Sequence, residues 1–379
     1  MTDWDDERLA RAVLTLVCEP GHLKLSRLIS AHGAAATVDA LRRSGDESAW
    51  AQRAKKADEA ALRRNAEAAG LRFLIPGDPE WPARLDDLGN AVEVQGLGGI
   101  PVGLWAAGPL RVDEAAARSV AVVGARAATR YGEAVAGDLA AGLAREPNGY
   151  VVVSGGAYGI DAAAHRGALA SQGESIGIYA GGLDEAYPRG NGRLFEELKA
   201  EHLVISEMAP GIRVTRAAFL ARNRLIAALT IGTVVVEAAA RSGARNTASW
   251  ASELGREVMA VPGSVHSAMS AGCHRLIRDG QATLVSDVDD VRALLAPVGL
   301  GPVLADRGPD RMLDSVDPEL LAVRESMPAR SGISVPELAV KCGQSVPRIV
   351  GALVELEVLG LVAQDQTGAW RLKRSARAS

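Results

Sequence analysis

The chain has 379 residues, enough for two or three domains. Hydrophobic residues make up 48% and charged residues 23%, which predicts a sizeable core and excludes wholesale disorder. The net charge of −4 argues against a protein coated in basic surface, although it is compatible with a local basic groove.

Three widely spaced cysteines, Cys18, Cys273 and Cys342, form neither a disulfide framework nor a CxxC metal motif. No metal and no other cofactor is therefore predicted. The acidic start lacks the basic and apolar segments of a signal peptide, and no apolar run reaches the roughly 18 residues that span a bilayer. We expect a cytoplasmic protein without membrane contact.

Residues 1–70 carry apolar side chains at helical spacing and predict a small helical domain. Its last helix is expected to run from about Glu47 to Ala69. Residues 71–110 are punctuated by prolines, which exclude long helices. The apolar piece from Val92 to Leu97 is a candidate short strand.

From Ser119 onward, continuous apolar runs end at glycine or at a polar residue. The runs are 120–123, 150–153, 175–179, 203–205, 233–236 and 257–261. Helical stretches lie between them, including Gly132–Ala144, Ile160–Ala170 and Thr215–Leu229. Strands without polar alternation are buried on both faces, so this region predicts an α/β fold with a parallel sheet and helices on each side.

Prolines and glycines at 297–313 predict a linker to a small last domain at 314–374. Its expected elements are three helices and a hairpin. They cover Pro318–Met327, a helix capped by Ser334, Ser345–Glu357, and a hairpin at Leu361–Leu372 with Gly368 at its turn. This order predicts a winged helix-turn-helix.

The carboxyl ends of parallel strands face one edge of a sheet, where ligands bind, so the loops after these strands converge. In the first loop, Gly124 permits close approach of a ligand, and the next helix presents its amides to an anion. Arg126, Thr129 and Arg130 belong to the same loop, which lacks the GxGxxG dinucleotide pattern. A tight turn with exposed arginines is the alternative.

The second loop, Ser154–Asp161, offers small residues and several free amides, which suit a phosphate. Within it, Asp161 is favoured as a helix cap rather than as a ligand. One helical turn further on, His165 is favoured as a packed structural residue rather than as a functional group.

The third segment, residues 213–226, holds four arginines, no carboxylate and one of the three phenylalanines of the chain, Phe219. Arg222, Asn223 and Arg224 lie next to the apolar pair that ends it. Arginines for phosphates beside an exposed aromatic ring for bases are typical of single-stranded nucleic-acid sites. The alternative places Phe219 in the core and the arginines in solvent.

The fourth segment begins at Glu237, at the end of a strand, and continues through Ser242, Gly243 and Arg245. Glu237 is a candidate catalytic acid, a ligand for a hydroxyl, or an ion-pair partner of an arginine. The last of these is favoured.

Positive charge is concentrated in these loops. Segments 124–132, 213–224 and 241–245 together hold eight arginines and no acid, whereas residues 118–285 as a whole hold 17 Arg or Lys and 15 Asp or Glu. Residues 313–373 hold 6 Arg or Lys and 8 Asp or Glu, and phosphate neutralisation dominates non-specific DNA affinity. The last domain is therefore predicted to be a protein-contact or spacer module.

An ordered set of motifs resembles the DprA/Smf family (DNA processing protein A) over about 170 residues. The motifs are Val123–Arg126, Ser154–Asp161, Gly182–Asp184, Tyr187–Pro188, Ser206–Glu207, Arg222–Ile226, Ser242–Gly243 and Val261–Gly263. The sequence departs from the family pattern at Leu220, where proline is common, and at Gly243-Ala244-Arg245, where Gly-Ser-Leu is common.

The resemblance implies an extended Rossmann-like domain at 71–296 between a helical domain at 1–70, similar to SAM or helix-hairpin-helix modules, and a winged-helix domain. It further implies a homodimer that is not an enzyme. Such a protein binds single-stranded DNA and loads the RecA recombinase onto it in natural transformation and DNA recombination.

The candidate DNA-binding residues combine the four loops with what the resemblance implies. They are Gly124, Arg126, Thr129, Arg130, Ser154, Gly155, Gly156, Gly159, Phe219, Arg222, Asn223, Arg224, Ser242, Gly243 and Arg245.

The main rival is a nucleotide-processing enzyme of the same superfamily, similar to phosphoribohydrolases. It is disfavoured because Val236–Ala239 lacks the glycine string of those enzymes. A winged-helix regulator of duplex DNA is a third class, which the acidic last domain disfavours.

Overall fold

A computed structural model describes residues 4–45, 47–145, 147, 149–240, 242–296, 316–329 and 331–373. The predicted linker at 297–313 lies outside these residues. The chain divides into two compact units, Met1–Leu304 and Ala305–Ser379, and each is described by itself.

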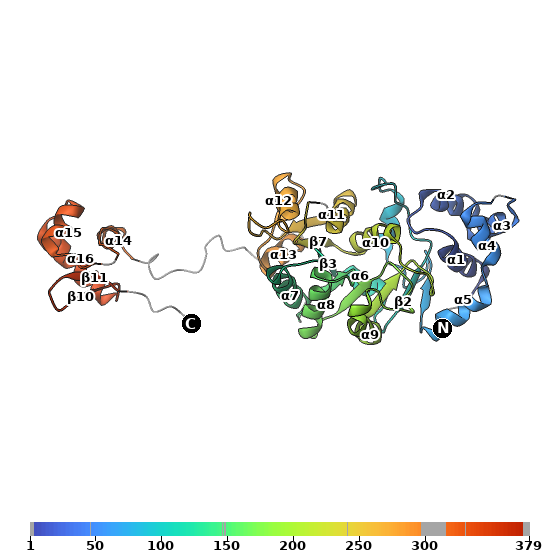
Figure 1. Ribbon diagram of the computed structural model, residues 1–379, viewed down its shortest axis with the longest axis horizontal. Helices are drawn as coiled ribbons and strands as arrows, with labels where there is room; N and C mark the ends of the chain where they lie inside the picture. Colours follow the sequence, from blue (N-terminus) through green and yellow to red (C-terminus); the bar gives the residue numbers. More distant parts are fainter. Residues whose placement is uncertain are drawn as a thin grey trace. The chain divides into compact units, whose positions relative to one another are not determined.

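The first unit is built on a nine-stranded sheet with the order β1-β2-β6-β5-β4-β3-β7-β8-β9 (Figure 1). Its strands are β1 Arg72–Leu74, β2 Leu104–Ala107, β3 Ser119–Gly124, β4 Val151–Ser154, β5 Ser175–Ile178, β6 Leu203–Ser206, β7 Gly232–Val236, β8 Glu257–Ala260 and β9 Thr283–Leu284. Neighbours from β6 to β9 run parallel, whereas β1 and β2 are antiparallel additions at one edge. The α/β class is confirmed, and the six predicted runs are strands β3 to β8.

Helices cover both faces of this sheet. Those of the parallel region are α6 Val112–Ala117, α7 Arg130–Ala144, α8 Ile160–Ala170, α9 Gly192–Glu201, α10 Arg216–Leu229, α11 Gly243–Glu253, α12 Ala271–Arg278 and α13 Val288–Leu295. Alternate residues of β3 point to opposite layers: Val120 and Val122 pack with α7 and α8, whereas Ala121 and Val123 pack with α10 and α11. Helices exclude water from both faces of the sheet, which explains why polar and apolar residues do not alternate along the strands.

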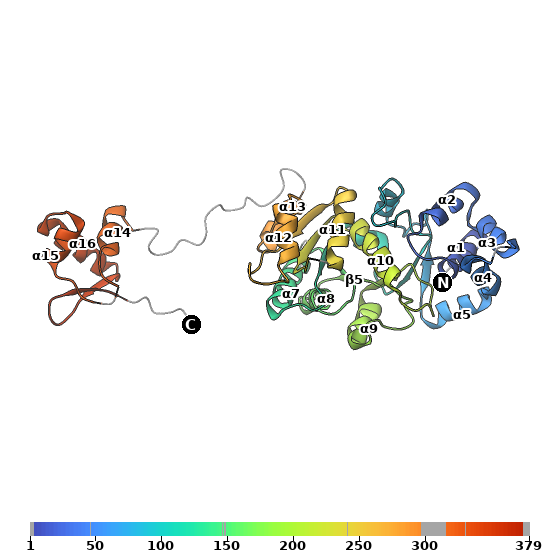
Figure 2. The same cartoon turned by 45° about the horizontal axis from the view of Figure 1, so that its top comes forward.

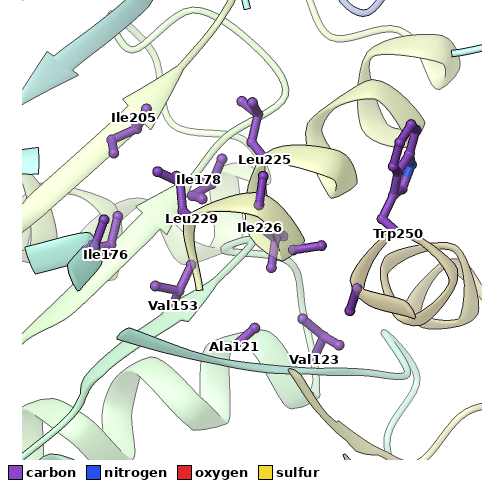
Figure 3. Close-up of a cluster of buried hydrophobic side chains, with 14 of the residues drawn as sticks. Ala121, Val123, Val153, Ile176, Ile178, Ile205, Leu225, Ile226, Leu229 and Trp250 are labelled. Carbon is purple, nitrogen blue, oxygen red and sulfur yellow. The ribbon is translucent and has the colours of Figure 1, made fainter. Parts of the chain in front are cut away.

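The end of α10 is anchored in the core. Leu225, Ile226 and Leu229 project from it onto the strands (Figure 3), and all three are buried. Trp250 of α11 is buried in the same cluster. The anchor fixes the rotation of α10, and with it the direction in which the earlier residues of that helix point.

The N-terminal helices are α1 Asp6–Val17, α2 Leu23–His32, α3 Ala34–Arg43, α4 Ala49–Lys56 and α5 Glu59–Ala68. They gather beside β2 in both views (Figures 1 and 2) and share a core with the sheet. The rings of Trp105 in β2 and Phe73 are tilted by 40° with their centres 4.5 Å apart, and Trp105 Nε1 donates a hydrogen bond to Thr15 Oγ1 at 3.0 Å. These helices therefore fold onto the sheet rather than forming a separate core.

The single helix expected from Glu47 to Ala69 is wrong, because the chain forms α4 and α5 instead. The break comes at Asp58, whose carboxylate accepts a hydrogen bond from Ala61 N at 2.9 Å and starts α5. An aspartate that caps a helix outcompetes continuation of the preceding one.

The strand considered at Val92–Leu97 is also not formed. Gln95 and Gly96 have positive φ values of 55° and 77°, which turn the chain so tightly that only a single bridge, Val94 with Leu97, remains.

The second unit holds α14 Pro318–Glu325, α15 Val335–Cys342 and α16 Val346–Val358, followed by a hairpin of β10 Val362–Gln364 and β11 Trp370–Leu372. These are the three helices and the hairpin that the sequence predicts. Ser334 starts α15 with a capping box, in which its hydroxyl accepts from Glu337 N and the Glu337 carboxylate accepts from Ser334 N. The unit has its own core around Leu338, Leu353 and Trp370.

Candidate nucleic-acid interface

A pocket of about 800 Å³ opens at the carboxyl edge of the sheet. It lies where β3 and β7 are neighbours, although the chain leaves β3 toward β4 and returns to β7 only after β6. Such a reversal of strand order leaves a crevice between the loops that diverge from the two strands. The sheet topology, rather than any single loop, creates this pocket.

Three segments supply most of the pocket wall: the loop after β3, the first half of α10, and the loop from β7 into α11. We call it the arginine pocket. Its lining residues are Gln95, Val123, Gly124, Ala125, Arg126, Ala127, Asp161, Arg216, Phe219, Leu220, Arg222, Asn223, Ile226, Ala239, Ala240, Ser242, Gly243, Ala244, Arg245, Asn246, Thr247, Ser249 and Met269. Among them, four arginines face one carboxylate, that of Asp161.

A cation and an aromatic ring meet at the mouth of this pocket. The guanidinium of Arg126 lies 4.4 Å from the centre of the Phe219 ring, and that of Arg222 lies 6.0 Å from it. Arg126 is exposed and Phe219 is half-buried, so the alternative of a core phenylalanine is wrong. Both groups remain accessible to a ligand.

Arg222 forms the charged floor of the pocket. It is only 5% exposed, and its Nη1 donates to Ile178 O at 3.0 Å, while its Nε has no hydrogen-bond partner. Burial lowers the pKa of Arg222, and nearby Asp161 opposes that shift. Arginine stays protonated in proteins, so a buried guanidinium with unused donors favours an anion that enters the pocket.

The sequence favoured Asp161 as a helix cap, but this prediction is wrong. The N-cap of α8 is Gly159, and the Asp161 carboxylate instead accepts from Gly155 N at 3.1 Å and from Ala157 N at 3.4 Å. Burial raises the pKa of Asp161, while the positive charge of Arg222 lowers it. Two of the loop amides that were expected to hold a phosphate, those of Gly155 and Ala157, are therefore already satisfied within the protein.

The other residues of that loop also serve packing rather than the pocket wall. Ser154 Oγ donates to Val122 O at 2.7 Å. A Cβ at Gly155 would lie 1.4 Å from Arg222 Nη1, and one at Gly156 would lie 2.6 Å from the Tyr179 ring. Gly155 thus makes room for the Arg222 guanidinium, while Gly159, at φ 71°, takes a backbone conformation that favours glycine.

Arg224 is not in the pocket, contrary to the sequence-based prediction. It is 1% exposed and forms a two-pronged ion pair with Glu207, with both N–O distances at 2.6 Å. Two residues along a helix rotate a side chain by about 200°, so Arg222 and Arg224 point to different sides of α10. Adjacency in the sequence concealed this division of roles.

The first predicted loop is likewise divided. Gly124 and Arg126 line the pocket, but Thr129 and Arg130 do not. Thr129 donates from its N and its Oγ1 to the two carboxylate oxygens of Glu237, at 2.8 and 2.6 Å. Among the described residues, Glu237 therefore fixes the start of α7, whereas the sequence favoured an ion pair with an arginine.

The fourth segment brings Ser242, Gly243 and Arg245 to the pocket, whereas Arg241 lies outside the described residues. Ser242 caps α11 through Ala244 N, and Arg245 Nη1 donates to Ala240 O at 2.8 Å. His165 is buried and bonded through Nδ1 to Ser175 Oγ at 2.8 Å, as its predicted structural role requires.

The candidate residues chosen from the sequence omit several residues of the pocket wall, among them the polar residues Arg216 and Asn246. Arg216 lies three residues before Phe219, so helical spacing places these two side chains on the same side of α10. Asn246 accepts from Asn223 Nδ2 at 3.2 Å, and its own buried Nδ2 has no partner. Only the packing of α10 against α11 brings these two amides together.

The described residues contain no group of three or more His, Cys, Asp or Glu side chains that could hold a metal ion. In the same part of the chain, no helix combines the length and apolar character needed to cross a membrane.

Two solved structures of bacterial proteins resemble the first unit. DNA processing protein A (DprA) of Streptococcus pneumoniae is 32% identical, with a TM-score of 0.62, and the match covers 76% of this chain and 97% of that one. DNA processing protein A of Helicobacter pylori, described for its single-stranded DNA binding mode, is 26% identical, with a TM-score of 0.50 and coverage of 59% and 95%.

Sequence relatives agree with the structures. A putative DNA processing protein DprA of Mycobacterium tuberculosis is 42% identical over 381 residues, which cover 98% of this chain and 96% of the relative. Protein Smf of Escherichia coli is 36% identical over 266 residues, or 68% of each chain. Residues 72–296 match the family model of DNA recombination-mediator protein A. The chain therefore belongs to the DNA recombination-mediator protein A (DprA/Smf) family.

Proposed function

We propose that this chain binds single-stranded DNA in the arginine pocket and delivers it to a RecA recombinase. One observation carries the proposal: the guanidinium groups of Arg126 and Arg222 lie 4.4 and 6.0 Å from the centre of the Phe219 ring, and all three residues line the pocket. The guanidinium groups suit phosphates, and the half-buried ring suits an unpaired base.

A single strand fits this site better than a duplex does. A base can stack on Phe219 only when it is free of its Watson–Crick partner, and the ring lines the pocket wall instead of projecting from the surface. The H. pylori relative, which is described for single-stranded DNA binding, supports the same choice.

The test is a fluorescence anisotropy titration with an unstructured oligonucleotide and with its duplex. Arg126→Ala and Phe219→Ala should each weaken single-strand binding by about tenfold or more, because a base–aromatic stack contributes about 1–3 kcal/mol. Arg130→Ala is the matched control, since Arg130 is an exposed arginine of the same loop that does not line the pocket.

Equal losses in Arg126→Ala and Arg130→Ala would point to general surface charge and contradict the pocket. Release of free base from a nucleoside monophosphate would instead support the phosphoribohydrolase-like alternative. The salt dependence offers a second check, because removing one phosphate contact should make the slope of log K against log salt shallower by about 0.7.

Delivery to the recombinase is the further part of the proposal, and it draws on the match to a recombination-mediator family. We expect the full chain, acting as a homodimer in a bacterial cytoplasm, to shorten the lag before RecA filaments form on strands covered by single-strand-binding protein. Arg126→Ala should lengthen that lag again. An unchanged lag with the wild-type chain would contradict delivery while leaving strand binding intact.

A further inference from the structure

Asn246 carries an unused hydrogen-bond donor in the wall of the arginine pocket. It lies near the start of α11, lines the pocket and is only 5% exposed. Among the described residues, its Nδ2 has no hydrogen-bond partner. A buried donor without a partner lowers stability, so a wall residue that keeps such a donor suits a ligand that brings an acceptor.

Asn223 of α10 fixes which way this amide points. Its Nδ2 donates to Gly243 O at 3.3 Å and to Asn246 Oδ1 at 3.2 Å. A backbone carbonyl can only accept, so Asn223 must turn its amino group toward Gly243. Asn246 must then present its oxygen to Asn223, which leaves its own amino group free. The two amides, which we call the amide pair, therefore offer the pocket a donor, while the acceptors beside that donor are already engaged.

The amide pair lies close to the ring on which a base would stack. Phe219 and Asn223 are four residues apart on α10, so they lie on the same side of that helix, one turn apart. Both line the pocket, whose volume of about 800 Å³ is large enough for a nucleotide. A base stacked on Phe219 can therefore direct its polar edge to the amide pair.

Bases differ in what they offer to a donor at this position. Thymine, uracil and guanine carry an exocyclic oxygen where cytosine and adenine carry an amino group. An oxygen there accepts from Asn246 Nδ2. An amino group instead sets one donor against another and leaves the Asn246 donor unpaired.

The other polar groups of the pocket wall do not reverse this preference. Asp161 already accepts from the amides of Gly155 and Ala157, and the positive charge of Arg222 lies near its carboxylate. Gln95 is exposed, and its carboxamide offers a donor and an acceptor alike, as hydroxyl groups do, so it serves both kinds of base.

We propose that Asn246 makes the arginine pocket select bases with an exocyclic oxygen over bases with an amino group at the same position. The inference rests on the proposed strand binding and adds a base preference to it. The arginines give affinity for any strand through its phosphates, whereas Asn246 distinguishes one base from another.

Fluorescence anisotropy with strands of deoxyuridine and of deoxycytidine, equal in length, tests this preference. The two bases have the same ring size and differ at one edge, where uracil carries the oxygen and cytosine the amino group. A slightly alkaline buffer keeps both strands unstructured. The wild-type chain should bind the uracil strand about fivefold more tightly, because one hydrogen bond distinguishes the two complexes.

Asn246→Asp replaces the free donor by an acceptor, so it should reverse the ratio of the two affinities in favour of the cytosine strand. Ser249→Asp is the matched control, since Ser249 is an exposed residue of the same helix and the same pocket wall. It adds the same negative charge, so it should weaken binding of both strands and leave their ratio unchanged. Asn246→Ala adds no charge and should bring the two affinities close together.

The ratio of affinities is insensitive to a fraction of unfolded protein, because unfolded chains bind neither strand. Equal affinities in the wild type, or the same ratio in the wild type and Asn246→Asp, would overturn the preference. Equal losses for both strands in Asn246→Ala would assign the amide to a phosphate and overturn it as well.

The strand-binding proposal fails by a different result. Arg126→Ala should weaken binding of both strands alike and keep their ratio. If both affinities were unchanged in Arg126→Ala, strand binding in the pocket itself would be contradicted, whereas equal wild-type affinities that Arg126→Ala lowers would contradict the base preference alone.

Discussion

Gly155 shows how one small residue can decide the chemistry of the site. The guanidinium of Arg222 occupies the space that any other side chain at this position would need. The sequence predicted that Gly155 belongs to a phosphate-binding loop, whereas the structure shows that it makes room for the Arg222 guanidinium. The absence of a side chain at Gly155 therefore allows the positive charge of Arg222 at the floor of the pocket.

Gly155→Ala should displace Arg222, destabilise the fold by about 1–3 kcal/mol, and weaken single-strand binding. Urea unfolding and anisotropy measure the two effects. Gly192→Ala is the control, because a methyl group there meets nothing within 4 Å. Full affinity in a folded Gly155→Ala chain would show that Arg222 does not need its present position.

Arg224 and Glu207 form a buried pair whose members depend on each other. Arg224→Met should lower the free energy of unfolding by about 3–5 kcal/mol, because it strands a buried carboxylate. Arg224→Met/Glu207→Leu should recover much of that loss. Urea denaturation of the two variants measures both free energies of unfolding. If Arg224→Met were as stable as Arg224→Met/Glu207→Leu, the two residues would not be coupled.

His165 should make stability depend on pH. Burial, helped by the nearby charges of Arg222, His202 and Arg166, lowers the pKa of His165 from 6.5 to about 3. The unfolded chain therefore takes up a proton that the folded chain refuses, so stability is complete above pH 6.5 and falls as the pH decreases toward 3.

Between pH 7 and 5 this loss is about 2 kcal/mol. His165→Asn cannot titrate, so the stability of the wild type relative to this variant should fall by that amount over the same range. Chemical denaturation at several pH values measures it. A constant difference would mean that His165 has the same pKa in the folded chain as in the unfolded chain.

At the level of elements, α10 joins the core to the pocket. Its second half is anchored by Leu225, Ile226 and Leu229, and its first half carries Phe219 and Arg222. Thr215 starts the helix by accepting a hydrogen bond from Ala218 N at 3.1 Å.

Thr215→Ala should remove this cap and cost about 1 kcal/mol of stability. Because the first turn also positions Arg216 and Phe219, strand affinity should fall with it, while Thr215→Ser should preserve both. Thermal unfolding and anisotropy of the two variants provide the comparison. An alanine variant with unchanged affinity would show that the first turn is held by the sheet alone.

The parallel strands were predictable from sequence because their apolar runs are continuous and end at glycine or polar residues. The roles of the arginines were less accessible. Sequence spacing could have placed Arg216 with Phe219, but no local pattern reveals that Glu207, 17 residues away, neutralises Arg224. The break at Asp58 was missed because helix propensity on both sides concealed a cap. Of these cases, only the pairing of Arg224 depends on a side-chain partner distant in the sequence.

At the scale of the whole molecule, the chain has two units with separate cores. Calorimetry should therefore resolve two unfolding transitions. Leu353→Ala should shift only the transition of the second unit to lower temperature. It should lower the free energy of unfolding of that unit by about 2–5 kcal/mol, because Leu353 is fully buried there. A single transition shifted by this variant would show that the units unfold as one.

The pairing of β3 with β7 has a consequence for when the binding site is complete during synthesis of the chain. Ala121 of β3 pairs with Thr233 of β7, although more than a hundred residues separate them in the sequence. Contacts between such distant residues form late, because a long loop must first be closed. We therefore expect a partly synthesised chain to present no finished binding site, so that DNA capture begins only after the return strand has left the ribosome.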